Sequence, residues 1–234
     1  YVIPDTDVEK ITINSNYAFP ENNFRDNYLY TKGFFSNTKK IKFKLFTDKP
    51  NPEYNEIFYT PKLNWNNYDK FLVGIKFHNK SIIETPFQYS ILPYYSTGTG
   101  KLVGSTAVSY RIQPAESFYR SLTLAASAAA FHYDYDLTYR RFGASATMAL
   151  NKNPRSQIGR NIIVSYNHFD RELSEAMQLK NDYSKYNIWN FGFIYSENNV
   201  ILEKYLFSNF QVMEDYQKLT AESFYRWEYA QNKK

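Results

Sequence analysis

The chain has no cysteine and only three histidines among its 234 residues. The absence of cysteine excludes a disulfide scaffold and a thiolate metal site, although it does not place the protein in a compartment. Long apolar runs are also missing, because none approaches the roughly 18 residues of a membrane-spanning helix. The sequence therefore gives no support to a helical membrane protein.

Aromatic side chains are abundant instead, with 23 tyrosines and 19 phenylalanines. Together with aliphatic residues they recur at every second position, in one segment after another from Phe71 to Tyr229. Successive side chains of a strand point to opposite faces, so each segment has one apolar face and one mostly polar face. This pattern predicts an all-β fold, either a membrane barrel or a soluble barrel or sandwich. The mean hydropathy of -0.59 fits a membrane barrel, since only every second residue meets lipid.

The alternation also predicts where the strands lie. We expect a short strand at 41–45 and longer strands at about 55–65, 69–79, 86–96, 102–113, 117–133, 137–151, 157–169, 186–197, 200–214 and 217–230. Several exceed the roughly 5 to 6 residues of a common soluble strand and match the roughly 9 to 11 that cross a bilayer at a tilt. The connections are too short for parallel crossovers, so we expect an antiparallel meander of hairpins.

Two segments need separate interpretation. Residues 122–130 are rich in alanine and, taken alone, fit a helix as well as a strand, but their neighbours favour a strand. Small residues there and in 142–150 leave room inside a barrel for a plug or folded loop, and tight packing explains them equally well. The polar stretch 171–185 is expected to be a rim loop with a helical turn through Leu173, Met177 and Leu179.

The two ends of the chain differ in regularity. Residues 1–38 are rich in Asn, Asp and Pro, with only Ile11 and Ile13 hinting at alternation, so we expect an irregular linker there. Residues 39–234 carry the barrel strands, and the strand pattern continues almost to the last residue. Because a sheet in lipid must close to pair its edges, we expect further strands beyond the chain end.

Residues that usually carry chemistry are scattered along the sequence. His78, His132 and His168 stand apart at strand ends, without the spacing of a zinc motif, and we interpret them as rim or girdle residues. The carboxylates Asp134 and Asp136 lie at a turn, where solvation is their usual role. We therefore predict no catalytic, cofactor-binding or metal-binding residue in this chain.

The chain is basic, with a net charge of +5 and a pI near 9.0. The lysines and arginines are dispersed instead of clustered with aromatics on one platform, so we predict no nucleic-acid partner. We interpret the following arginines as lumen or rim charges that meet water or lipid headgroup anions: Arg111, Arg120, Arg140, Arg141 and Arg160.

Three runs of sequence carry a family resemblance, namely 58–75, 86–95 and 152–156. They resemble the C-terminal β-barrel region of Bacteroidota outer-membrane proteins, in which the barrel often follows an aminopeptidase-N-like (gluzincin) metallopeptidase domain in the periplasm. The similarity covers most of residues 1–230, and residues 3–7 resemble the linker between the two regions. The zinc motif of that peptidase is absent here, so no catalytic residue carries over. The resemblance implies location and architecture, with a peptidase domain preceding this region in the full-length protein.

The pattern and the resemblance lead to one expectation, an antiparallel up-and-down transmembrane β-barrel that is an incomplete part of a larger barrel. It would lie in the bacterial cell outer membrane as an anchor, a pore or a partner-holding scaffold, with no chemistry and no cofactor of its own. Its partners would be outer-membrane lipid and a periplasmic peptidase-like domain or other outer-membrane proteins. The alternative is a soluble β-sandwich or barrel that binds carbohydrate or lipid through exposed aromatics.

The barrel interpretation assigns side chains to surfaces. The residues expected to face lipid are Phe71, Val73, Ile75, Phe87, Tyr89, Ile91, Val108, Phe142 and Ala144. The aromatics expected at the two membrane interfaces are Tyr59, Trp65, Tyr94, Tyr95, Tyr110, Trp189, Tyr195, Tyr225 and Trp227.

We expect the purified chain to hold no catalytic zinc and to hydrolyse no peptide, because no base, nucleophile and oxyanion donor occur in a known arrangement. Metal analysis and a peptidase assay check this expectation. One tightly held zinc per molecule, lost on His78→Ala or His168→Ala, would contradict it.

Overall fold

The structure is a computed structural model that describes residues 8–16, 18–21, 24–32, 39–151, 153, 155–180 and 182–228. Its strands are β1 (Lys10–Thr12), β2 (Tyr28–Tyr30), β3 (Ile41–Leu45), β4 (Asn55–Asn66), β5 (Lys70–His78), β6 (Phe87–Ser96), β7 (Leu102–Ile112), β8 (Ser121–Asp134), β9 (Leu137–Ala149), β10 (Ile158–Arg171), β11 (Lys185–Asn198), β12 (Leu202–Met213) and β13 (Tyr216–Trp227). The expectations for residues 3–7, 152, 154 and 229–234 lie outside the described residues.

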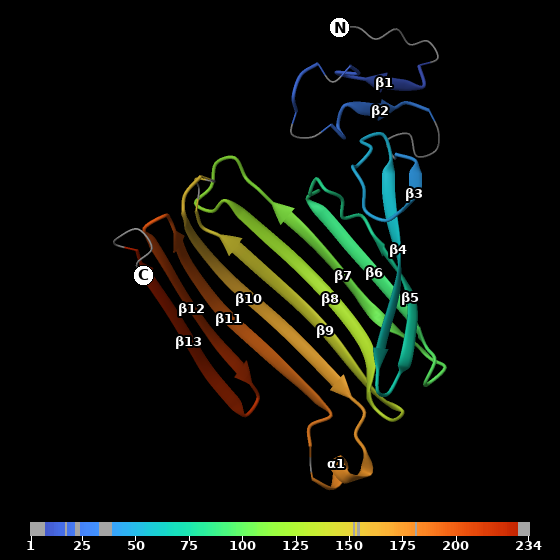
Figure 1. The fold of residues 1–234 in the computed structure, drawn as a ribbon, viewed down its shortest axis with the longest axis vertical. Coiled ribbons are helices and arrows are strands. Elements are labelled where there is room, and N and C mark those ends of the chain that lie inside the picture. Colours follow the sequence, from blue (N-terminus) through green and yellow to red (C-terminus); the bar gives the residue numbers. More distant parts are fainter. Residues whose placement is uncertain are drawn as a thin grey trace. The chain divides into compact units, whose positions relative to one another are not determined.

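Eleven strands form one large sheet, in the linear order β13 to β3, and strands consecutive in the sequence are neighbours in it. From β6 to β13 every neighbouring pair is antiparallel, as the ribbon shows (Figure 1). The all-β fold and the meander are therefore confirmed. Within the described residues the order has two ends and no closed barrel is found.

The expectation of an antiparallel sheet is wrong for one pair. β3 and β4 are parallel, with Ile41 opposite Asn55 and Leu45 opposite Tyr59. Phe46 follows β3 with a φ of 60° and donates its N–H to the Tyr59 carbonyl, after which the chain returns to the start of β4. The proline-containing turn therefore belongs to a crossover shorter than the roughly twelve residues that parallel strands usually need.

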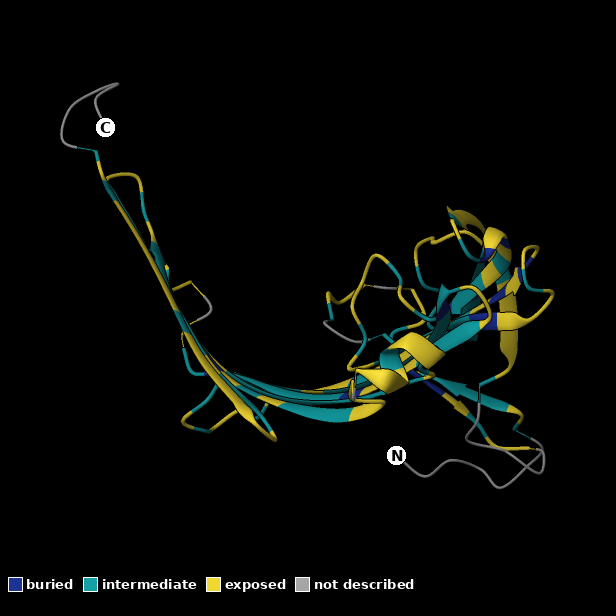
Figure 2. Cartoon of the chain, turned by 90° about the horizontal axis from the view of Figure 1, so that it is seen from below, coloured by how far each residue is buried: buried dark blue, intermediate teal, exposed yellow. Residues whose placement is uncertain are grey.

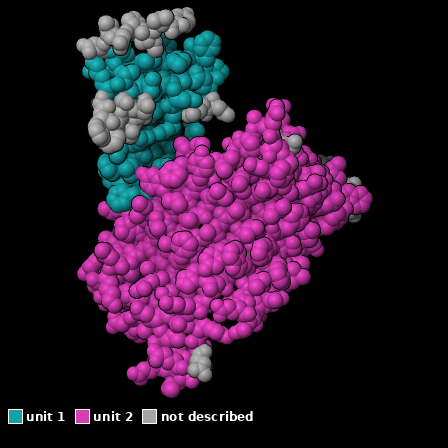
Figure 3. Space-filling view, turned by 180° about the vertical axis from the view of Figure 1, so that it is seen from behind, with its two compact units in different colours: residues 1–60, 77–84 teal, residues 61–76, 85–234 magenta. Residues whose placement is uncertain are grey.

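The chain divides into two compact units (Figure 3). The first unit consists of residues 1–60 and 77–84, and the second of residues 61–76 and 85–234. β4 and β5 each begin in one unit and end in the other. The division expected at residue 39 stays a prediction.

The first unit contains a small sheet inside the segment that we expected to be irregular. β1 and β2 pair there antiparallel, with Ile11 opposite Leu29. Polar contacts connect the rest of the unit: Lys44 Nζ lies 2.8 Å from Glu56 Oε1, and Arg25 Nη2 donates to Asn55 Oδ1 at 2.6 Å. Sequence periodicity misses this sheet because three-residue strands show no alternation.

The second unit has a small hydrophobic cluster beside several of its turns. Leu72, Tyr94 and Val103 are buried, and Leu92 and Phe131 pack against them. A Cβ at position 74 would lie 2.5 Å from the Tyr94 ring, so glycine there lets the ring cross β5. Most other residues of this unit are intermediate or exposed on both sides of the sheet (Figure 2).

Several local expectations are confirmed. Residues 122–130 lie in strand β8, not in a helix. The rim loop carries the helix α1 (Glu175–Leu179), whose N-cap Ser174 accepts a hydrogen bond from the Met177 N–H. No helix in the described part of the chain is long and apolar enough to cross a membrane.

We expect Gly104→Ala to lower the free energy of unfolding by about 1–3 kcal/mol through strain and overpacking. Gly104 has a φ of 153°, and an added Cβ would lie 2.2 Å from the Leu92 carbonyl oxygen. Denaturant unfolding monitored by circular dichroism measures the loss.

The matched control is Gly192→Ala, because the nearest atom to its added Cβ is an ordinary 3.5 Å away. This change should cause little or no loss. Equal losses at the two positions would show that close backbone approach at Gly104 is not what requires glycine.

Candidate functional site

The strand register sorts the side chains of the second unit onto two faces. Residues opposite each other in neighbouring strands share a face. Val108 lies opposite Tyr89 and Ala126, and Ala144 lies opposite Ala126 and Tyr166. Following such pairs defines the apolar face, which includes Tyr89, Ile91, Thr106, Val108, Ala126, Ala128, Phe142, Ala144, Val164, Tyr166, Trp189, Phe191, Phe193, Leu206, Ser208, Phe210, Leu219 and Ala221.

Charged side chains on this side of the sheet occur only in two rows near the strand ends, as far as the described residues of β6 to β13 show. The first charged row crosses β9, β10 and β11 and consists of Arg140, Asp170 and Lys185. The second charged row crosses β10, β11 and β12 and consists of Arg160, Glu197 and Lys204. On β10 the rows are ten residues apart, from position 160 to 170. At about 3.3 Å per residue, this separation is about 33 Å along the strand.

Large apolar side chains between the rows are exposed. Phe142 is 49% exposed, Phe191 47% and Leu219 71%. Trp189 packs on Tyr166, with ring centroids 4.8 Å apart. An apolar surface this continuous is unusual on a monomeric soluble protein and usually marks a membrane or interaction surface.

The opposite side, here called the polar face, carries hydrogen-bonded amides. Asn190 Nδ2 donates to Ser165 Oγ at 3.2 Å, and Gln211 Nε2 donates to Asn190 Oδ1 at 2.9 Å. Arg141 Nη2 donates to Asn167 Oδ1 at 2.8 Å. These bonds connect β9 with β10 and β10 with β12 through β11, so this face suits contact with water.

The residues that we expected to share one side of the meander do so wherever the register connects them. They are Phe87, Tyr89, Ile91, Val108, Phe142 and Ala144. The prediction for one interfacial aromatic is wrong. Tyr94 is only 7% exposed and belongs to the buried cluster, while its neighbour Tyr95 is 51% exposed. Adjacent residues of a strand point to opposite faces, so only one of the two tyrosines, Tyr94, reaches the buried cluster.

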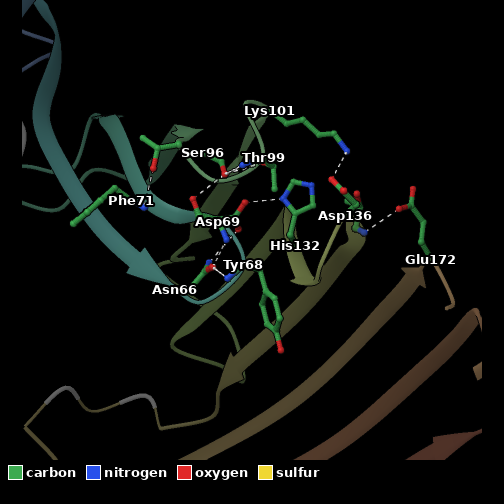
Figure 4. Close-up of polar contacts among 12 residues, drawn as sticks. Asn66, Tyr68, Asp69, Phe71, Ser96, Thr99, Lys101, His132, Asp136 and Glu172 are labelled. Atoms are coloured by element: carbon green, nitrogen blue, oxygen red, sulfur yellow. Dashed lines mark hydrogen bonds and ion pairs between the residues drawn. The ribbon is translucent and has the colours of Figure 1, made fainter. Parts of the chain in front are cut away.

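A buried histidine–aspartate pair lies among the turns at one end of this unit (Figure 4). His132 Nδ1 is 2.7 Å from Asp69 Oδ1, and their side chains are 1% and 0% exposed. Asn66 Nδ2 donates to Asp69 Oδ2 at 3.1 Å, while Ser96 Oγ and the Gly98 N–H donate to the Asp69 carbonyl. This His132–Asp69 cluster therefore joins the β4–β5 turn, the β6–β7 turn and the end of β8.

The surroundings of Asp69 favour its charged form. Burial acts to raise its pKa, but the polar groups of Asn66, Ser96 and His132 outweigh burial, so the pKa of Asp69 lies below its usual value. The cluster contains a carboxylate and an imidazole, as hydrolase sites do, but no serine, threonine or cysteine side chain among the described residues is hydrogen-bonded to the imidazole. His132 Nε2 is buried without a hydrogen-bond partner among the described residues.

The structure corrects the expectation for one histidine. His132 is not an isolated rim residue, because it pairs with a carboxylate 63 positions away in the sequence. His168 Nδ1 lies 2.8 Å from Asn187 Oδ1 near the first charged row, and His78 packs against Phe58 with ring centroids 5.7 Å apart. Across the described ranges, no three His, Cys, Asp or Glu side chains are grouped to hold a metal ion.

Comparison of the chain with protein-family models, with curated proteins and with solved structures gave no match.

We expect the low pKa of Asp69 to make stability depend on acidity. The depressed folded pKa gives stability that is present above the unfolded value of about 4 and is lost as the pH falls through the folded pKa. Asp69→Asn should lower the free energy of unfolding at pH 7 by about 1–3 kcal/mol, because it removes the charged partner of His132. As the pH falls below about 4, the free energy of unfolding of Asp69→Asn should then decrease less than that of the wild type.

The control is Asp136→Asn, because the Asp136 carboxylate is 83% exposed and lies 3.8 Å from Lys101 Nζ. Exposed pairs of this kind contribute little. Denaturant unfolding at a series of pH values compares the variants, and identical acid dependence of Asp69→Asn and wild type would refute the role given to Asp69.

Proposed function

We propose that the second unit is a wall segment of a transmembrane β-barrel in a bacterial outer membrane, with its apolar face toward lipid. In this function the chain anchors a protein in the membrane, lines a pore or holds a partner, and performs no chemistry itself. The observation that carries the proposal is the spacing of the two charged rows. A separation of about 33 Å along strands tilted by about 35–45° spans roughly 23–27 Å of membrane, close to the apolar band of about 25 Å in outer-membrane barrels.

Strand length and connectivity support the same function. β5 to β13 are 9 to 14 residues long, enough to cross a bilayer at a tilt. The meander of consecutive hairpins is the connectivity of outer-membrane barrels. Since lipid offers no hydrogen bonds to the edges of a linear sheet, the proposal includes further strands, from this protein or from a partner, that close the barrel.

A soluble role fits the apolar face less well. The described residues of the second unit place no second layer on Phe142, Phe191 or Leu219, which would then meet water. Exposing these side chains to water is unfavourable, and contact with lipid hydrocarbon avoids that exposure without a second layer of protein.

The sequence resemblance supports the location and a partner. Residues 58–75 and 86–95 resemble barrels that follow a gluzincin peptidase domain in Bacteroidota outer-membrane proteins. A periplasmic peptidase-like domain preceding this region is therefore the partner that we propose for the anchor, together with outer-membrane lipid.

Fractionation of cells that express the protein tests the location. We expect it in the outer-membrane fraction, extracted by detergent but not by urea or alkaline carbonate, with heat-dependent mobility on gels. Release from the membrane by urea alone would contradict the proposal.

Two adjacent residues near mid-strand of β10 test the assignment of the faces. Val164→Arg on the apolar face should destabilise the membrane-inserted protein by about 2–4 kcal/mol, because the charge would lie in hydrocarbon. Ser165→Arg on the polar face should cost less, since its charge reaches the wet side. Unfolding from lipid vesicles measures both, and equal losses would refute the assignment.

A further inference from the structure

The cations of the second charged row are held over tyrosine rings. The Arg160 guanidinium lies 5.9 Å from the ring centroid of Tyr195, its direct partner across the β10–β11 pair. Lys204 Nζ lies 5.8 Å from the ring centroid of Tyr225, its direct partner across the β12–β13 pair. Each cation therefore contacts a tyrosine ring of the neighbouring strand, on the same face as the exposed apolar residues.

The acidic group of this row leaves positive charge uncompensated. Glu197 Oε2 accepts a hydrogen bond from the Tyr195 hydroxyl at 3.0 Å and lies 3.6 Å from Lys204 Nζ. The row thus has two cations and one carboxylate, and that carboxylate pairs with Lys204. Within the described part of the chain, the Arg160 guanidinium forms no ion pair, so its N–H donors remain open to an outside acceptor.

The first charged row is built differently. Asp170 stands between Arg140 and Lys185 and is the direct partner of both across the strand pairs. Among the described residues, no tyrosine ring lies under either of those cations. The tyrosine rings that orient its cations therefore make the second row the better prepared of the two for an anion.

We propose that the second charged row binds the phosphate group of anionic lipid headgroups, an inference that rests on the proposed membrane function. The row stands where the apolar band ends, which is the depth of the headgroups and of interfacial tyrosines. The guanidinium of Arg160 presents paired N–H donors that match two phosphate oxygens, and Lys204 adds a second charge. Contact with the rings orients both cations before the lipid arrives.

Lipid selectivity of the inserted protein tests the proposal. Spin-labelled phosphatidylglycerol and phosphatidylcholine compete for the motionally restricted lipid shell of the protein in phosphatidylcholine vesicles. We expect the wild type to prefer phosphatidylglycerol, and Arg160→Gln and Lys204→Gln each to reduce that preference about fivefold, the factor for one cation near an anionic surface.

The matched control is Arg226→Gln. Arg226 follows Tyr225 in β13 but lies on the polar face, where it pairs with Glu203 at 2.7 Å. Its removal takes away the same charge at nearly the same depth, and lipid preference should not change. A loss equal to that of Arg160→Gln would overturn the proposal, because a general charge effect would explain both.

Further outcomes of this experiment distinguish failure of the phosphate site from failure of the membrane function. A restricted lipid shell without preference for phosphatidylglycerol would refute the phosphate site and leave the membrane function standing. Absence of any restricted lipid would refute the membrane function itself. Displacement of phosphatidylglycerol by millimolar inorganic phosphate would assign the site to a free anion and overturn the lipid as its occupant.

Discussion

The register of the hairpins is the constraint on which the rest of the second unit depends. The pairs from β6 to β13 place mostly apolar residues opposite one another on one face, as Val108 with Ala126 and Val164 with Phe191 show. A slip of one residue in any hairpin would turn all side chains of that strand to the other face. The apolar face, the polar face and both charged rows exist only because the register holds across all eight strands.

Buried contacts near one end of the unit help to hold that register. The His132–Asp69 cluster joins the β4–β5 turn, the β6–β7 turn and the end of β8, and the Tyr94 ring packs over Gly74. Buried polar pairs add little net stability when balanced against desolvation, but they penalise arrangements that leave either partner without the other. We infer that this cluster specifies how the hairpins align more than it stabilises them.

The placement of charge explains how a sheet with little buried core fits the proposed role. In water, the exposed side chains between the charged rows would be unfavourable, whereas hydrocarbon is a suitable solvent for them. The amides on the other side, such as Asn190 and Gln211, satisfy one another and remain accessible to water. A wall between lipid and an aqueous interior needs both properties at once.

Alternation along the sequence was enough to predict the strands from β3 to β13 and which of their side chains share a face, because side-chain direction in a strand depends only on position parity. The neighbouring strands identified β8 despite an alanine-rich composition that also fits a helix. Tertiary structure alone decided the parallel pairing of β3 with β4, the burial of Tyr94 and the meeting of His132 with Asp69. These features depend on which distant segments come together, and a local two-residue pattern carries no information about such contacts.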